Sequence, residues 1–189
     1  MRLAWLVLAA CTHTVHVDDL HLHPMVPPEI DHKIALPVCV VAPTSALAEP
    51  AVFGDESVLG RYLIEAYGVP SFVQRDLVAV LGNWFTDVHA GPANPGCIVL
   101  RATLERLTGQ DGRKFSQVGA GRLRAILDWT VEVTIPGAPR FNFTYRDRVE
   151  GPARTDATEI VKGVLETALS HFSAELFVRA SGIAAQVRR

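Results

Sequence analysis

Three consecutive segments in the second half of the chain alternate between apolar and polar residues, and this pattern constrains the fold most. A period of two is typical of strands that bury one face and expose the other. The segments span 97–107, 121–133 and 140–149, and turn-forming residues at 108–118 and Pro136–Pro139 connect them. The sequence therefore predicts an antiparallel three-strand meander with one face in a core and one face in water.

A register for the first hairpin follows from matching the apolar faces of its two strands. This register also sets opposite charges side by side, which contributes a few tenths of a kcal/mol per pair, roughly. The predicted pairs are Leu104 with Ala125, Ala102 with Leu127, Leu100 with Trp129, Glu105 with Arg124, and Arg101 with Asp128.

Two further segments repeat apolar residues every three to four positions, as helices that pack against a sheet do. One segment spans 72–88, and the other runs from Asp156 to about Val178. Their apolar stripes comprise Leu77, Val80, Leu81, Trp84 and Val88 in the first, and Val161, Val164, Leu165, Ala168, Leu169, Phe172 and Leu176 in the second. We predict an α+β fold, a two-layer sandwich in which both helices cover one face of a mainly antiparallel sheet.

The first eleven residues have the parts of an export signal. Arg2 precedes an apolar run, Leu3–Ala10, which is too short to span a bilayer, and Leu8–Cys11 resembles the bacterial lipobox. We expect Cys11 to carry a covalent diacylglycerol and an N-acyl group, and we expect no other cofactor. Thr12, in place of the Asp that commonly retains lipoproteins in the inner membrane, predicts the periplasmic face of the outer membrane. A buried first strand or an N-terminal helix of a cytosolic protein remains the alternative.

The rest of the chain fits one globular domain. Of its 189 residues 49% are hydrophobic and 20% are charged, enough apolar material for a core. Residues 34–41 read as a buried strand and 42–60 as a long loop. Residues 61–69 read as a further strand, with a helical turn as the alternative. The predicted parts are a signal peptide at 1–10, the lipidated cysteine with a polar His-rich tether at 11–32, the α+β domain at 33–180 and a basic tail at 181–189.

The His-rich lead is the one segment that suggests a metal. If it is extended, Asp19, His21 and His23 share a face, and imidazole with carboxylate suits zinc or copper. No closing ligand is evident in the sequence, so a solvated linker is the favoured reading. Cys39 and Cys97 form a disulfide in an oxidising compartment or, alternatively, stay as two buried thiols.

No catalytic residue is predicted. Ser57 lacks the tight glycine-flanked elbow of a nucleophilic serine, and His89 reads as a cap on helix carbonyls. His171 reads as a surface or packing residue. A polar sheet face offers a partner surface instead, with a solvated face as the alternative, and its arginines are Arg122, Arg124, Arg146 and Arg148.

The order of elements resembles the YajG-like family of envelope lipoproteins and, more loosely, auxiliary lipoproteins of lipid transport such as PqiC. The resemblance is carried by Leu8–Cys11, the helix opening Gln74–Leu77, the strand Ile98–Leu107 and the run Phe143–Arg146. It implies a binding or accessory role and supplies no catalytic residue. The chain departs from the family in its His-rich lead and in the segment 42–60.

The function expected from these features is a non-enzymatic binding or scaffolding subunit of an envelope complex, with an envelope protein as its partner. The alternatives are a small-ligand or lipid carrier with a groove between helices and sheet, and, more weakly, a metal-binding protein. A formal net charge of −2 gives no general attraction to nucleic acid.

Overall fold

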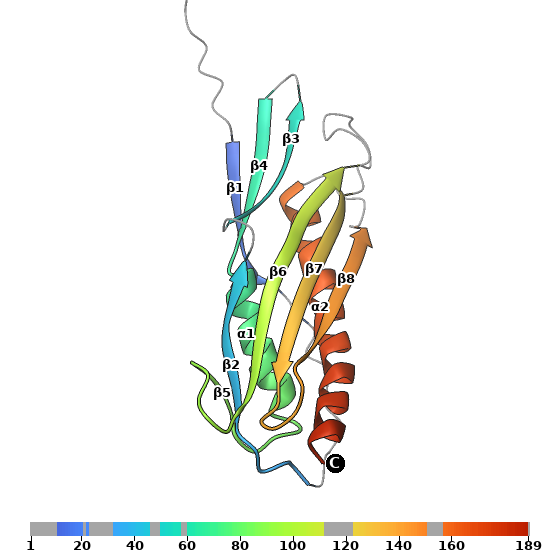
Figure 1. The fold of residues 1–189 in the computed structure, drawn as a ribbon. Coiled ribbons are helices and arrows are strands. Elements are labelled where there is room, and N and C mark those ends of the chain that lie inside the picture. Colours follow the sequence, from blue (N-terminus) through green and yellow to red (C-terminus); the bar gives the residue numbers. More distant parts are fainter. Residues whose placement is uncertain are drawn as a thin grey trace, which may run out of the picture.

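The computed structural model describes residues 11–20, 22, 32–45, 50–57, 60–111, 123–150 and 157–188. Two long helices lie behind one face of a five-stranded sheet, and a second sheet of three strands adjoins it (Figure 1). The strands are β1 (Cys11–His16), β2 (Val38–Ser45), β3 (Ala51–Ser57), β4 (Gly60–Tyr67), β5 (Val88–Ala90), β6 (Ile98–Asp111), β7 (Leu123–Thr134) and β8 (Phe141–Glu150). The helices are η1 (Val17–Asp19), α1 (Val69–Leu81) and α2 (Ala157–Val187).

The five-stranded sheet has the order β5-β2-β6-β7-β8. Strands β6, β7 and β8 form the predicted antiparallel meander, and both helices lie on one face, so the predicted α+β sandwich is confirmed. The sheet is mixed, because β2 pairs in parallel with both β5 and β6. Parallel pairing needs a long crossover, and the chain between β2 and β6 supplies one that contains α1.

The predicted register of the first hairpin is wrong. Leu104 pairs with Trp129 and Ala102 with Val131, and a bulge between Leu104 and Arg106 shifts the remaining pairs. Strand β6 extends to Asp111, beyond its predicted end, and β7 begins at Leu123 rather than at residue 121, so the connection between them lies further along the chain than predicted. Up to Leu104 the register is shifted by four residues, an even number, so these side chains keep their predicted face. Beyond the bulge the shift is odd, and Leu107 points into the core.

The limits of α1 are set by local chemistry. Gly68 adopts φ 85, a left-handed conformation suited to glycine, and the helix begins at the next residue. It ends at Leu81 rather than at residue 88, because the side-chain amide of Asn83 donates to the carbonyls of Ala79 and Val80. Trp84 and Val88 therefore lie beyond the helix, in a turn and in β5.

Helix α2 runs past its predicted end to Val187, and Ile183 and Ala184 on this extension are buried. The prediction of a basic tail at 181–189 is therefore wrong up to residue 187. No helix in the part of the chain that the structure describes is both long and apolar enough to cross a membrane.

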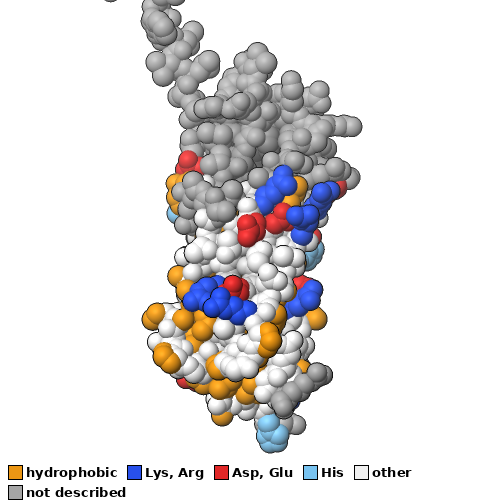
Figure 2. All heavy atoms as spheres, viewed as in Figure 1, with side chains coloured by type: hydrophobic (Ala, Val, Ile, Leu, Met, Phe, Trp, Pro, Cys, Tyr) orange, Lys and Arg blue, Asp and Glu red, His pale blue; other side chains and the backbone are white. Residues whose placement is uncertain are grey.

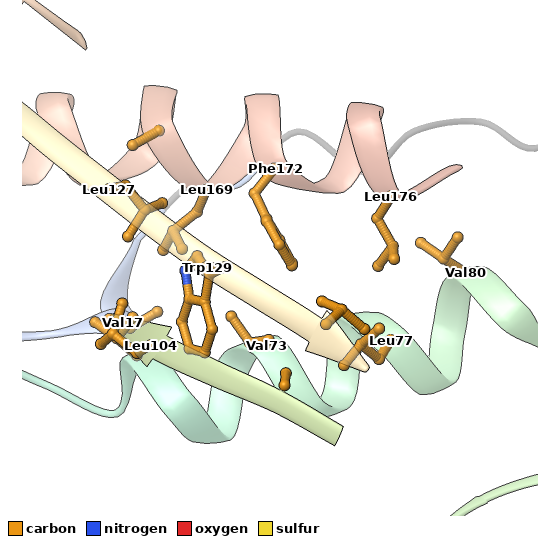
Figure 3. Packing of buried hydrophobic residues seen from close by; sticks show 14 of the residues in the cluster. Val17, Val73, Leu77, Val80, Leu104, Leu127, Trp129, Leu169, Phe172 and Leu176 are labelled. Atoms are coloured by element: carbon orange, nitrogen blue, oxygen red, sulfur yellow. The ribbon is translucent and has the colours of Figure 1, made fainter. Parts of the chain in front are cut away.

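The core fills the layer between sheet and helices. Trp129 on β7 is 1% exposed, and its ring centroid lies 5.9 Å from that of Phe172 on α2. Val73 of α1 and Leu169 of α2 approach the same indole from either side, together with Leu104 of β6 (Figure 3). Interlocking of side chains from two helices and two strands leaves the layer packed around Trp129.

The chain after Cys11 is folded, which corrects the predicted tether. Strand β1 pairs in parallel with β4, and Val15, Val17 and Leu20 are buried in the core. The tether interpretation is wrong for residues 12–20, because these apolar side chains complete the layer beside α1. Residues 21 and 23–31 lie outside the described residues, as does the predicted signal peptide at 1–10.

The predicted loop at 42–60 is also wrong for 42–45 and 51–57, while 46–49 and 58–59 lie outside the described residues. Strand β2 continues to Ser45, and β3 pairs antiparallel with β4. The strand predicted at 61–69 is confirmed by β4 up to Tyr67, and Val69 already belongs to α1. The predicted domain limits 33–180 are too narrow at both ends.

Candidate functional site

A row of four threonines crosses the sheet face that α1 and α2 leave uncovered. Strand register pairs Thr44 with Thr103, Thr103 with Thr130 and Thr130 with Thr144, one threonine on each of β2, β6, β7 and β8. The hydroxyls of Thr44 and Thr103 lie 3.1 Å apart. Neighbouring strands are about 4.8 Å apart, so this threonine row spans roughly 14 Å.

Charged side chains flank the threonine row on both sides. The first charged row comprises Arg101, Glu132 and Arg140, with Glu132 Oε1 lying 3.6 Å from Arg101 Nη1 and 4.0 Å from Arg140 Nη1. The second charged row comprises Arg106, Asp128 and Arg146, with Arg146 Nε 2.9 Å from Asp128 Oδ1. In each of the two rows, the carboxylate on β7 lies between two arginines.

These rows form a surface rich in hydrogen-bonding groups. Figure 2 shows two groups of charged side chains on this face with an uncharged band between them. The side chains of Arg140 and Arg146 are 71% and 73% exposed, and each guanidinium has five N–H donors, more than one carboxylate uses. The surface can therefore offer arginine and hydroxyl donors to a partner.

The predicted partner arginines belong partly to this surface. Arg146 and Arg148 lie on the uncovered face of β8, where the side chains alternate with the core. Arg124 is paired with Glu150 in the strand register, but its side chain, like the whole of Arg122, lies outside the described residues. The threonine row was not predicted, because only the true register aligns Thr103 with Thr130.

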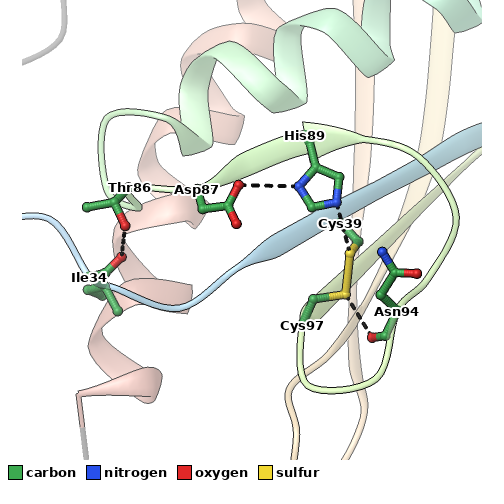
Figure 4. A network of polar contacts seen from close by, with 7 residues as sticks. All are labelled: Ile34, Cys39, Thr86, Asp87, His89, Asn94 and Cys97. Atoms are coloured by element: carbon green, nitrogen blue, oxygen red, sulfur yellow. Dashed lines mark hydrogen bonds and ion pairs between the residues drawn. A yellow bond between two sulfur atoms is a disulfide. The ribbon is translucent and has the colours of Figure 1, made fainter.

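A disulfide joins Cys39 on β2 to Cys97, the residue directly before β6. His89 on β5 lies beside it, with Nε2 3.5 Å from Cys39 Sγ and Nδ1 3.4 Å from Asp87 Oδ1 (Figure 4). The prediction that His89 caps a helix is wrong, because parallel pairing of β2 with β5 places His89 opposite Cys39.

A third polar cluster ties β8 to α2. The carboxylate of Asp147 accepts hydrogen bonds from the Tyr145 hydroxyl at 3.1 Å and the Arg148 backbone N–H at 2.7 Å, and His171 Nδ1 lies 2.7 Å from it. Burial, and then the nearby charge of Asp147, raise the pKa of Tyr145. An open notch of about 380 Å³ lies here, between the edge strand and α2. The contact between His171 and Asp147 joins α2 to β8. We therefore assign this cluster a structural role, in which it holds the helix against the sheet.

The described residues include one of the predicted metal ligands. Asp19 lies at the end of the short helix η1 and not in the extended segment that was predicted. His21 and His23 lie outside the described residues. Within the described ranges, no three His, Cys, Asp or Glu side chains are grouped to hold a metal ion.

A partly buried carboxylate joins the two helices. Asp76 on α1 accepts a hydrogen bond of 2.7 Å from the hydroxyl of Ser173 on α2. Burial raises the pKa of Asp76 to about 6, and the hydrogen bond from Ser173 only partly opposes this rise. The charged form of Asp76 therefore destabilises the folded state near neutral pH.

Replacing Asp76 with Asn should stabilise the protein at pH 7. The folded-state pKa of about 6 lies above the ordinary 3.8, so the folded chain binds this proton more tightly than the unfolded chain does. The associated stability is full below about pH 4 and is lost as the pH rises through 6. We expect D76N to raise the free energy of unfolding at pH 7 by about 1–3 kcal/mol, with no gain at pH 3.5 or below.

Urea unfolding of D76N and the parent chain across this pH range measures the difference. Asp18→Asn is the matched control, because Asp18 is exposed and pairs with Arg75 on the surface of α1. A similar pH-dependent gain in D18N, or none in D76N, would contradict the assignment.

Neither the protein-family models nor the curated proteins give a match to this chain. Among solved structures, protein XCC0632 from Xanthomonas campestris, of family DUF330, is similar with a TM-score of 0.58 and 13% identity, covering 95% of this chain and 98% of that chain. A protein described as a homolog of the neuraminyllactose-binding hemagglutinin, from Helicobacter pylori, has a TM-score of 0.56 and 12% identity, with 89% and 100% covered.

Bacterial lipoproteins are also among the similar structures, at lower scores. Rare lipoprotein B from Shewanella oneidensis has a TM-score of 0.45 and 11% identity, with 79% of this chain and 99% of that chain covered. At these identities the two stronger likenesses establish the fold alone. Membership of the YajG-like family stays a prediction.

Proposed function

We propose that the chain is a lipid-anchored, non-enzymatic subunit of the bacterial cell envelope that binds a partner through the open face of its five-stranded sheet. The observation that carries the proposal is the threonine row between its two charged rows. The helices cover the opposite face, and Thr44 and Thr144 at the two ends of the threonine row are exposed, so a partner can reach this face. Exposed ion pairs such as those of Glu132 with Arg101 and Arg140 contribute little to stability, about 0–1 kcal/mol each, so folding alone does not account for this row.

Cell-envelope placement rests on the lipobox-like residues Leu8–Cys11. The fold is also that of a Helicobacter pylori protein whose name refers to binding, which supports a binding role by analogy of fold. The outer membrane is the proposed membrane, since Thr12 follows the cysteine.

A binding surface is favoured over a lipid carrier by the packing of the core. A carrier needs an apolar cavity between helices and sheet. Trp129 and Phe172 fill that layer with ring centroids 5.9 Å apart, and Trp84 packs at 6.0 Å from Phe177.

Loss of the anchor should release the chain from the membrane. With Cys11→Ala the chain cannot accept diacylglycerol, so we expect it to leave the membrane pellet, and globomycin should accumulate the unprocessed form of the parent chain. Membrane fractionation with immunoblotting measures both the release of the C11A chain and the accumulation of the unprocessed parent chain. An unchanged, processed and membrane-bound C11A chain would refute the anchor.

Contact through the open face can be tested by photo-crosslinking in intact cells. A benzophenone side chain at Thr144, at the exposed end of the threonine row, should capture one defined envelope species, and Thr103→Lys with Thr130→Lys should abolish the capture by blocking the middle of the row. The same probe at Gln186, exposed on α2, is the control position. Capture that survives the two lysines, or that is equal from Gln186, would rule out this face.

A further inference from the structure

Both sulfurs of the Cys39–Cys97 disulfide have polar neighbours. Cys39 Sγ lies 3.5 Å from His89 Nε2, and Cys97 Sγ lies 3.1 Å from the backbone carbonyl oxygen of Asn94 (Figure 4). Asp87 lies on the far side of the imidazole, 3.4 Å from Nδ1, which directs Nε2 toward the sulfur.

These neighbours suit two reduced cysteines better than they suit a disulfide. A disulfide sulfur carries no proton, so Cys97 has nothing to donate to the Asn94 carbonyl until it becomes a thiol. A disulfide sulfur is also a weak acceptor, whereas a Cys39 thiolate would accept strongly from His89. Both contacts therefore gain strength on reduction, and they shift the equilibrium toward the dithiol.

We propose that Cys39–Cys97 is an exchangeable disulfide that a dithiol reduces while the fold stays intact, with His89 as the proton donor. The thiolate of the reductant attacks Cys97 Sγ and forms a mixed disulfide. The Cys39–Cys97 bond breaks, and Cys39 leaves as a thiolate that takes the proton on His89 Nε2.

The second thiol of the reductant then completes the exchange. It attacks its own sulfur in the mixed disulfide, and Cys97 leaves and takes up a proton as a thiol. His89 regains from solvent a proton equal to the one that the attacking thiol released. The protein gains two thiol hydrogens and the reductant becomes a disulfide, so atoms and electrons balance.

The surroundings of Cys97 allow such an approach. Residues 92–96 form an exposed turn immediately before Cys97, and the space that a Cβ on Gly96 would occupy is open. The His89 side chain is 42% exposed, so it can exchange protons with solvent. Cys97 itself is 4% exposed and Cys39 is fully buried, which makes Cys97 the sulfur to be attacked.

The rate of reduction by dithiothreitol tests this assignment. The full chain carrying Cys11→Ser has Cys39 and Cys97 as its remaining cysteines, and maleimide labelling of quenched samples counts the free thiols. We expect the rate to rise in proportion to dithiothreitol concentration, with native circular dichroism before and after. His89→Gln keeps a hydrogen-bonding group but cannot deliver a proton, and it should slow reduction by about tenfold or more.

His171→Gln is the matched control, because it makes the same change at a histidine beside Asp147, away from the disulfide. Its reduction rate should equal that of the parent chain. Equal rates for H89Q and the parent would overturn the proposal. So would a parent rate that is independent of dithiothreitol concentration, because reduction would then wait for global unfolding.

Discussion

Replacing Trp129 with Ala lowers the free energy of unfolding by about 3–5 kcal/mol, the usual cost of truncating a buried aromatic side chain. Trp129 is 1% exposed and packs against Phe172, with Val73 and Leu104 in the same cluster. Because side chains from both helices and two strands meet around the indole, none of them alone can fill the space it leaves. Urea unfolding monitored by circular dichroism measures the loss.

Trp129→Phe separates the packing of this residue from its polarity. The indole N–H of Trp129 is buried without a hydrogen-bond partner among the described residues, so its removal loses no bond there. We expect W129F to cost clearly less than W129A. A loss below about 1 kcal/mol in W129A would mean that this layer is not the central core.

Removing the disulfide, with Cys39→Ala and Cys97→Ala together, should lower the free energy of unfolding by about 2–4 kcal/mol. The bond links residues 58 positions apart, so its loss gives the unfolded chain much more freedom. Such a domain has roughly 5–15 kcal/mol of stability, so the double variant should still fold. Urea unfolding under oxidising conditions gives the value.

Reduction of the parent chain by an excess of a phosphine reductant provides the comparison. Reduced parent and double variant lack the same covalent bond, so their losses should be similar. A double variant as stable as the oxidised parent would show that the link does not restrict the unfolded chain.

The faces of the meander strands could be predicted from sequence, whereas their register could not. Alternation alone placed Leu100, Ala102 and Trp129 in the core, as observed. Any even shift preserves those faces, and opposite charges are available in both registers: Arg101 meets Glu132 in the structure instead of Asp128. Charge pairs worth a few tenths of a kcal/mol, roughly, could not select between them.

The sites were missed because they depend on contacts between distant segments. His89 and Cys39 are 50 positions apart, and only parallel pairing of β2 with β5 joins them. The first helix was predicted too long because Trp84 and Val88 continue the helical spacing of apolar residues. The sequence signal for the end of this helix is the Gly82–Asn83 pair. In the N-terminal lead, Val15 and Val17 are isolated apolar residues among polar ones, so the sequence gives no clear sign that they are buried.

The start of β1 at Cys11 gives the molecule a definite orientation on the proposed anchor. A lipid on that residue would be attached to a strand already paired with β4, so no flexible linker would separate the bilayer from the domain. In Figure 1 the first residues of β1 and the short strand β5 lie at opposite ends of the molecule. The three-stranded sheet would then stand next to the lipid headgroups, and the disulfide would face the periplasm at the distal tip. A soluble reductant could then reach the disulfide without approaching the membrane.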